Sequence, residues 1–335
     1  MRSSRGVFAM RRRQIGLTLV ELMVGLVISI VVSLAAAALY LATRESTRAT
    51  QGQGDINETG KIALDMVGRE LQKAGFYPAQ FVTPTDVSRA GKFYNGKTSA
   101  TTAAAKLLFN TGIYGCDNAK YKPADRTCDT IVAGAPDSVV INYYTSPEFG
   151  ASSLLGNTND CNRRPVSGDA DNTAKAAAGL PLLVSNRFGL VDTSYTNPDG
   201  TTITTKSLYC HGNGADTSTT LEPAIQGIEE MVIRYGISPG GTTESPTKFL
   251  TAADVALEST SPEGLTPWQR VSAVSICILV RSLENSRTED KTGSVRTYTN
   301  CRGVSTSMPS SNRYLYKTFT RVYAIRNNLH AVGTF

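Results

Sequence analysis

The stretch Gly16-Leu17-Thr18-Leu19-Val20-Glu21 places one carboxylate at the start of a long apolar segment. No residue in 22–43 carries a charge, which gives a run of 22 positions, and about 20 apolar residues are enough for a helix to cross a bilayer. A carboxylate at the edge of hydrocarbon is costly unless another group pairs with it, so Glu21 is a candidate functional residue. The sequence therefore predicts a transmembrane helix with an acidic site near its N-terminal end.

Five arginines form a basic flank ahead of this segment: Arg2, Arg5, Arg11, Arg12 and Arg13. Such a flank holds the N-terminus of a membrane segment in the cytoplasm. An ordinary secretory signal has an apolar core of roughly 7–15 residues and a small-residue cleavage site, for which Ala35-Ala36-Ala37-Ala38 is a candidate. The apolar run here is longer than that, and Glu21 has no place in such a core. A plain membrane anchor explains the length of the run but gives Glu21 no purpose.

The N-terminus resembles the type IV prepilin family. Its members have a short basic leader, a glycine at the cleavage site, an apolar first mature residue and a glutamate at the fifth mature position, which correspond here to Gly16, Leu17 and Glu21. The resemblance implies that a prepilin peptidase cuts after Gly16 and that the new α-amino group of Leu17 is methylated. It also implies that Glu21 pairs with the α-amine of a neighbouring subunit, because pairing lowers the burial cost of both charges. Two other interpretations stay open, in which Glu21 meets its own chain's amine or lies at the headgroup level.

Further segments resemble the PilW group of minor pilins. Residues 61–76, KIALDMVGRELQKAGF, are similar to the end of the N-terminal helix in that group, and three later blocks are similar in kind and order: 232–236, 268–274 and 321–327. This resemblance implies a subunit that assembles with other minor pilins and the major pilin to prime and cap the pilus fibre, often beneath a tip adhesin, in support of twitching motility and adhesion. Many major pilins have a proline near mature position 22, where this chain has Ala38.

The composition is that of an ordinary globular protein. The chain has 335 residues, 41% hydrophobic and 19% charged, enough for one large domain or two small ones. The net charge is +6, and the five leader arginines account for all but one of these charges. A nearly neutral mature chain gives no electrostatic reason to expect a nucleic-acid partner.

Six cysteines follow the apolar segment: Cys116, Cys128, Cys161, Cys210, Cys277 and Cys301. An even number in an oxidising compartment indicates disulfides, although six cysteines allow 15 pairings. Pairing of sequence neighbours gives Cys116–Cys128, Cys161–Cys210 and Cys277–Cys301, while Cys277 could also be a buried free thiol because it lies in an apolar run. A metal site is not expected, because the chain has no Cys-x-x-Cys motif and its only histidines are His211 and His330.

The pattern along the chain predicts an α+β fold, in which one long helix precedes a single antiparallel β-rich globular domain. We expect a basic leader over 1–16 and a pilin helix over 17–75, which is transmembrane over 17–43 and packs on the domain over 44–75. Gly52 and Gly54 weaken this helix by about 1 kcal/mol each, and Gly75 is a natural terminator. The domain, 76–335, has strand candidates rich in β-branched and aromatic residues at 139–144, 231–235, 271–280 and 314–325, with weaker ones at 182–184 and 208–209. Residues 193–205, with the turn Asn197-Pro198-Asp199-Gly200, are expected to form a long loop.

Catalytic and cofactor motifs are missing from the sequence. Neither His211 nor His330 lies in a recognisable nucleophile or base pattern, and there is no phosphate-binding or dinucleotide-binding glycine motif. Residues 169–172, DADN, lack the glycine and the closing glutamate of a calcium loop. Trp268 is expected to anchor the core or a sheet edge rather than to bind a ligand. We therefore expect neither an enzyme nor a cofactor.

These features predict a single-pass protein of the inner membrane, with its N-terminus in the cytoplasm and its domain in the periplasm. After assembly it would lie in the pilus, at the tip of the fibre. One alternative is a minor pseudopilin of a type II secretion system, although the usual β domain there is smaller than the roughly 260 residues that follow the helix here. A second alternative is a membrane-anchored periplasmic enzyme or binding protein.

Overall fold

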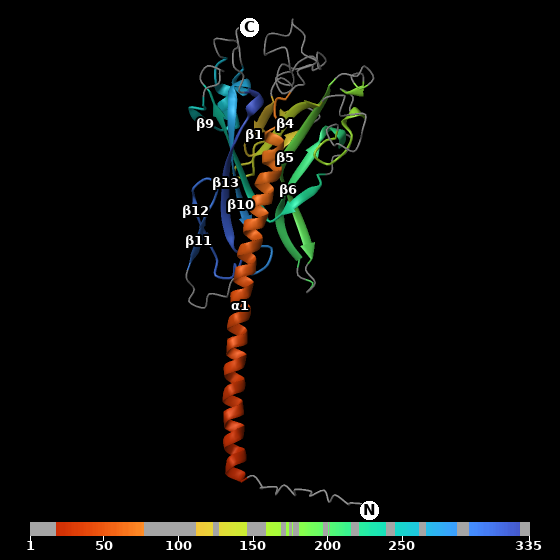
Figure 1. The fold of residues 1–335 in the computed structure, drawn as a ribbon. Coiled ribbons are helices and arrows are strands. Elements are labelled where there is room, and N and C mark those ends of the chain that lie inside the picture. The colour runs from red at the N-terminus through yellow and green to blue at the C-terminus, as the bar shows by residue number, and fades with distance from the viewer. Residues whose placement is uncertain are drawn as a thin grey trace, which may run out of the picture. The chain divides into compact units, whose positions relative to one another are not determined.

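The computed structural model describes residues 18–76, 112–122, 127–145, 159–168, 172–173, 176, 181–196, 200, 202–215, 221–238, 245–260, 266–286 and 295–328 (Figure 1). The chain forms two compact units, Met1–Thr50 and Gln51–Phe335. Among the predicted features, the leader, Gly16, Leu17, the Asn197-Pro198-Asp199 part of the turn, residues 169–171 and His330 lie outside the described residues.

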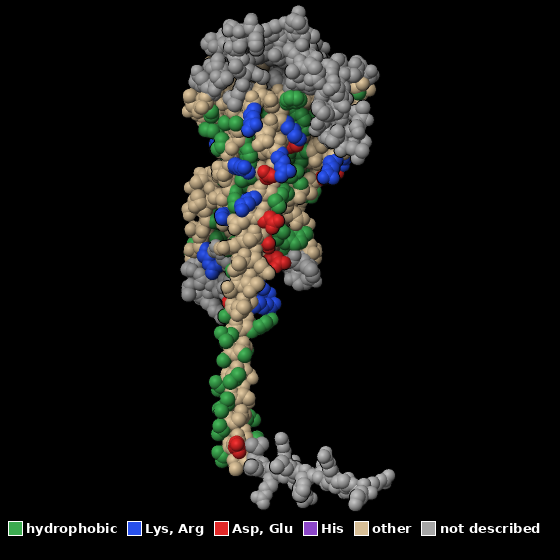
Figure 2. Space-filling view, viewed as in Figure 1, with side chains coloured by type: hydrophobic (Ala, Val, Ile, Leu, Met, Phe, Trp, Pro, Cys, Tyr) green, Lys and Arg blue, Asp and Glu red, His purple; other side chains and the backbone are tan. Residues whose placement is uncertain are grey.

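One continuous helix, α1 (Leu19–Leu71), begins in the first unit and ends in the second. By length and composition it can cross a membrane. In the first unit its apolar side chains are exposed, and Figure 2 shows hydrophobic groups around this part and charged groups along the part in the second unit. The helix continues through Gly52 and Gly54, and it ends before Gly75, whose φ of 74° is the left-handed conformation that glycine adopts easily.

The second unit contains two main antiparallel sheets. The four-stranded sheet has the order β13 (Tyr316–Ala324), β10 (Val271–Arg281), β8 (Ile228–Ile237) and β9 (Lys248–Leu250). The five-stranded sheet has the order β1 (Ile113–Cys116), β4 (Ser138–Thr145), β5 (Leu182–Thr196), β6 (Thr202–Gly212) and β7 (Pro223–Gln226). Buried side chains of both sheets and of α1 form one hydrophobic core. The long helix and the β-rich antiparallel domain are those that the sequence predicts.

Short elements complete the described part of this unit. Two hairpins lie apart from the main sheets, β2 (Tyr121–Lys122) with β3 (Thr127–Cys128) and β11 (Arg296–Thr299) with β12 (Ser305–Met308). The helical pieces are α5 (Ala252–Leu257), η4 (Val166–Gly168), η5 (Asn213–Ala215), η6 (Pro267–Arg270) and η7 (Arg326–Asn328). Trp268 of η6 is buried, with its ring 5.0 Å from that of Tyr114 and 4.9 Å from that of Tyr235, so it anchors the core.

The prediction of a long loop at residues 193–205 was wrong. β5 continues to Thr196 and β6 begins at Thr202, with Thr193 opposite Thr205 and Thr196 opposite Thr202. At the end of β5 the side chains alternate between half-buried and exposed. Serine and threonine are compatible with such a two-stranded ribbon, because one of its faces is exposed to solvent. The backbone hydrogen bonds are made between the two strands and do not depend on the side chains. The amino-acid composition of these strand ends therefore resembles that of a loop.

The part of α1 in the second unit packs on β13 through three buried glycines. A side chain at Gly52, Gly60 or Gly68 would collide with Ser286, Phe319 or Tyr323 respectively. Leu315, just before β13, also lies next to Gly52. The side chains that face the glycines, Leu315, Phe319 and Tyr323, therefore recur every four residues, while the glycines recur every eight. Four strand residues span about 13 Å and eight helical residues span about 12 Å, so the two periods match and fix the register of helix on strand.

The end of α1 is capped by a segment far away in the sequence. The side-chain amide of Asn327, in η7, donates to the carbonyls of Gln72, Lys73 and Ala74, at N···O distances of 3.4, 3.4 and 3.0 Å. The backbone N–H of Gly75 donates to the carbonyl of Asn142 in β4 at 2.9 Å. The Asn327 bonds satisfy carbonyls that a helix end otherwise leaves unpaired, and the Gly75 bond joins the helix end to the five-stranded sheet.

Candidate assembly site

The carboxylate singled out by the sequence lies in the first turn of α1. The backbone N–H of Glu21 donates to the hydroxyl of Thr18 at 3.3 Å, and that of Leu22 donates to the Thr18 carbonyl at 3.1 Å. Thr18-Leu19-Val20-Glu21 thus has the Thr-x-x-Glu spacing of a capping box, in which the threonine side chain satisfies an otherwise free N–H. The negative charge also lies at the positive end of the helix dipole.

Glu21 is exposed and has apolar neighbours that are exposed as well. Leu19 is 77% exposed and Leu22 is 61% exposed. Such a carboxylate, surrounded by hydrocarbon in a membrane, has a strong preference for a cationic partner. The arrangement can therefore act as an acceptor for a positively charged group. Gly16 and Leu17, which the sequence predicts to supply the cleavage site and the amine, lie outside the described residues.

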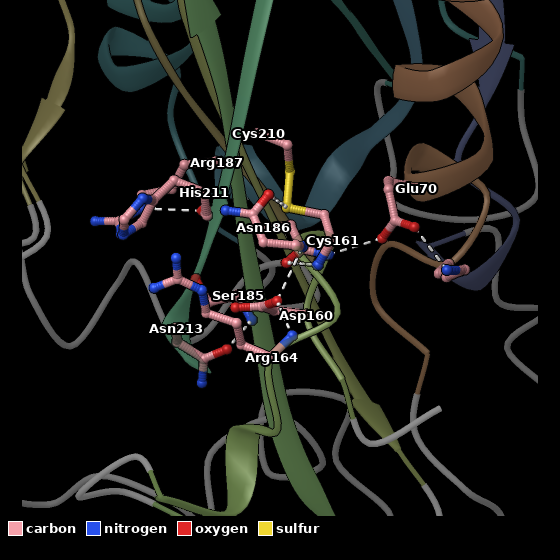
Figure 3. The surroundings of a disulfide bond; sticks show 12 residues. Glu70, Asp160, Cys161, Arg164, Ser185, Asn186, Arg187, Cys210, His211 and Asn213 are labelled. Carbon is pink, nitrogen blue, oxygen red and sulfur yellow. Dashed lines mark hydrogen bonds and ion pairs between the residues drawn. A yellow bond between two sulfur atoms is a disulfide. The ribbon is translucent and has the colours of Figure 1, made fainter. Parts of the chain in front are cut away.

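A second set of polar contacts holds the last turns of α1 on the domain (Figure 3). Glu70 accepts a hydrogen bond from the side-chain amide of Asn186, in β5, at 2.8 Å, and it pairs with Lys73 at 2.6 Å. The amide oxygen of Asn186 in turn accepts from the backbone N–H of Cys161 at 3.1 Å. Burial, followed by the negative charge of Glu70 and a hydrogen bond to it, raises the pKa of Tyr143 well above its usual value. Glu70 is thus the polar centre of the contact between helix and domain.

Each of the six cysteines is in a disulfide. Cys116 is bonded to Cys128, Cys161 to Cys210 and Cys277 to Cys301, with Cα–Cα distances of 5.5, 6.2 and 5.6 Å. These are the three sequence-neighbour pairs, and the alternative of a free thiol at Cys277 is wrong. Among the described residues no three His, Cys, Asp or Glu side chains form a group that could hold a metal ion.

Sequence reasoning missed the polar contacts at the helix end. Glu70 lies within the block 61–76 that resembles the PilW group, which is a signal for the segment but not for its partners. Asn186 and Asn327 are separated from the helix by more than a hundred residues. Asn186 lies in no motif, and Asn327 ends the PilW-like block 321–327, which does not indicate its partner. His211, which the sequence analysis weighed as a catalytic base, is buried in β6.

Comparison with known proteins agrees with these features. Residues 190–327 match the family described as type IV pilus-assembly protein W, PilW, and residues 11–37 match the prokaryotic N-terminal methylation motif. The chain thus combines a PilW-like region with a prepilin methylation motif. The methylation motif includes Gly16, Leu17 and Glu21, and the PilW region runs from the middle of β5 into η7.

The PilW family, which the chain resembles over this region, is one of structural pilins. The two matches imply, in general terms, contact with other pilins and with a prepilin peptidase. Among solved structures the chain is similar to a type IV-like pilin from Thermus thermophilus, with 10% identity, a TM-score of 0.33, and coverage of 82% of this chain and 98% of that chain. No curated protein matches the chain.

Proposed function

We propose that this protein is a minor pilin of a type IV pilus, which is cleaved after Gly16 and assembles with other minor pilins to prime and cap the fibre. The observation that carries the proposal is the presence of two independent pilin signatures in one chain, a methylation motif at 11–37 and a PilW region at 190–327. Before assembly the protein would reside in the inner membrane with its domain in the periplasm. Afterwards it would lie at the fibre tip, in support of twitching motility and adhesion, next to a tip adhesin.

The proposed mechanism is structural rather than catalytic. The exposed apolar part of α1 anchors the subunit in the membrane, because a helix of about 20 apolar residues is long enough to span the hydrocarbon core of a bilayer. Glu21 then pairs with the methylated α-amine of a neighbouring subunit. Each charge lowers the cost of burying the other, so the pair selects one axial position for the incoming helix. The β-rich domain would select the partner.

The experiment that tests the proposal is the substitution Glu21→Ala. The variant should be processed and inserted in the membrane, because removal of a carboxylate makes residence in hydrocarbon easier. Its amount in sheared pili should fall by more than about ten-fold, because loss of one member of a buried ion pair costs about 3–5 kcal/mol.

The matched control is Glu45→Ala, which removes an exposed carboxylate from the same helix beyond the apolar segment and should leave incorporation unchanged. Immunoblots of membrane and pilus fractions give both quantities. Wild-type amounts of Glu21→Ala in pili would contradict the docking role of this carboxylate. Deletion of the gene distinguishes a pilus subunit from a secretion-system subunit, since loss of protein secretion with normal piliation would favour the pseudopilin alternative.

A further inference from the structure

The Cys161–Cys210 disulfide fixes a small turn to the five-stranded sheet. Within the turn, one carboxylate oxygen of Asp160 accepts from the backbone N–H groups of Asn162 and Arg164, both at 2.9 Å. The Asp160 side chain packs closely on Gly212 in β6, where a Cβ atom would lie 2.1 Å from that of Asp160. Cys210 belongs to the same strand and is 1% exposed. The turn is therefore rigid in itself, and the disulfide joins it covalently to β6.

Asn186 lies between this turn and α1, as Figure 3 shows. It is fully buried, and its side-chain oxygen accepts from the Cys161 N–H while its nitrogen donates to Glu70. The oxygen and the NH₂ group of a side-chain amide point in different directions within one plane. When a neighbouring N–H donates to the oxygen, the NH₂ group must therefore point to the other side. The reversed orientation would place the NH₂ group against an N–H and the oxygen against a carboxylate. The position of Cys161, together with a hydrogen bond between Asn186 and the Tyr143 side chain, therefore sets how Asn186 presents its donor to the helix.

We propose that the Cys161–Cys210 disulfide is a positioning device for α1, which acts on the last helical turns through Asn186 and Glu70. A thiol reductant would break the S–S bond, supply two electrons and two protons to give two thiols, and itself become a disulfide. The turn would then be free to leave β6, and the Cys161 N–H would leave Asn186. The amide would lose the group that holds its oxygen, while its hydrogen bond with the Tyr143 side chain would remain. Lys73 and Tyr143 also face Glu70 and would remain, so the helix end should loosen rather than detach. This inference does not depend on the proposed function.

The test compares two double variants of the full chain in detergent micelles by hydrogen exchange. C161S/C210S removes the disulfide in question, and C277S/C301S removes one that closes a shorter loop, 24 residues against 49, and has no part in this contact. Both should lower overall stability, because each disulfide restricts the unfolded chain. Only C161S/C210S should speed exchange in residues 70–76, by about ten-fold relative to the rest of the domain, since a hydrogen bond to a charged group limits local opening. An equal rise in both variants, or no rise in this segment, would overturn the proposal.

A second comparison separates the relay from a general loss of packing. Asn186→Asp keeps the disulfide and an acceptor for Cys161 but cannot donate to Glu70, so it should reproduce the local increase in exchange. Glu70→Gln should change exchange at 70–76 when the disulfide is present and should change it much less in the C161S/C210S background, because the partner is then no longer oriented. Equal effects of Glu70→Gln in both backgrounds would show that the disulfide does not act through this contact and would overturn the proposal.

Discussion

At the scale of single residues, two glycines of α1 have opposite roles. A Cβ atom added at Gly68 would lie 2.2 Å from a ring carbon of Tyr323, whose hydroxyl donates to the carbonyl of Leu64. A Cβ atom added at Gly54 would meet nothing within 4 Å. Gly68 is thus required by the close approach of helix and strand, whereas Gly54 only costs the helix conformational entropy.

We expect Gly68→Ala to lower the free energy of unfolding by about 1–3 kcal/mol, because the ring of Tyr323 must move to admit the methyl group. Gly54→Ala should raise it by about 0.5–1 kcal/mol, because alanine is the better helix former. Urea denaturation of the two full-length variants in detergent, followed by circular dichroism, measures both changes. If the two substitutions shift the midpoint in the same direction, the glycines do not differ as described.

Tyr143 should affect how the stability of the protein depends on pH in the alkaline range. Its pKa is raised above the ordinary value of 10.0 by burial and by Glu70, so the folded protein keeps a proton that the unfolded chain loses above pH 10.0. The stabilisation is fully present below that pH and is lost as the pH rises further. Tyr143→Phe should reduce the slope of stability against pH above 10.0 by about 1.4 kcal/mol per pH unit, the effect of one proton. The slope will not vanish, because burial raises the pKa of Tyr209 to about 12. An unchanged slope would show that Tyr143 ionises freely.

At the scale of elements, the sequence predicts best where burial is continuous. The runs 231–235 and 271–280 lie in β8 and β10, whose side chains are mostly buried, so an apolar β-branched pattern marks them clearly. The ends of β5 and β6 form a ribbon of threonines with one wet face, and their composition resembles that of a loop. Short strands such as β9 and β12 hold too few residues for any period to appear. Their pairing depends on tertiary contacts.

The cap of α1 shows the same limit. Gly75 predicts where the helix ends, because its conformation is local. Asn327 satisfies the last carbonyls from 253 residues further along the chain. The two segments lie in the PilW-like blocks 61–76 and 321–327, but neither block indicates the contact.

We expect Asn327→Ala to lower the stability of the full chain by about 1 kcal/mol, because the partly buried carbonyl of Ala74 loses its donor. The exposed neighbour Arg326 provides the control, since Arg326→Ala should change stability by less than about 0.5 kcal/mol. Thermal unfolding of both variants measures the difference. A loss in the Arg326 variant as large as that in the Asn327 variant would assign the effect to η7 as a whole rather than to the cap.

At the scale of the whole molecule, some of the candidate functional residues can be found from the sequence and others cannot. Glu21 is evident because a charge interrupts an apolar pattern, and a membrane makes such an exception costly. The contact of Glu70 with Asn186 is invisible, because two ordinary polar residues acquire their role only when β5 and α1 meet. A charge in a membrane segment can be recognised from the local sequence alone. The contacts that dock the helix exist only in the folded domain.

The last prediction concerns the mature protein as a whole. Intact-mass analysis and N-terminal sequencing should show a chain that begins at Leu17, carries a methyl group on its α-amine, and is lighter by six hydrogen atoms because of the three disulfides. Gly16→Leu should retain the leader, because a peptidase that closely approaches the backbone at this position has no room for a branched side chain.

The control for this substitution is Gly25→Ala, at a position in the exposed apolar helix where a methyl group meets nothing within 4 Å, and it should be processed normally. A mature chain that begins near Ala38 would instead assign the N-terminus to ordinary secretory signals. In that case Glu21 would be removed with the signal, and the carboxylate could not dock a subunit, because the docking role requires that cleavage leave Glu21 in the mature helix.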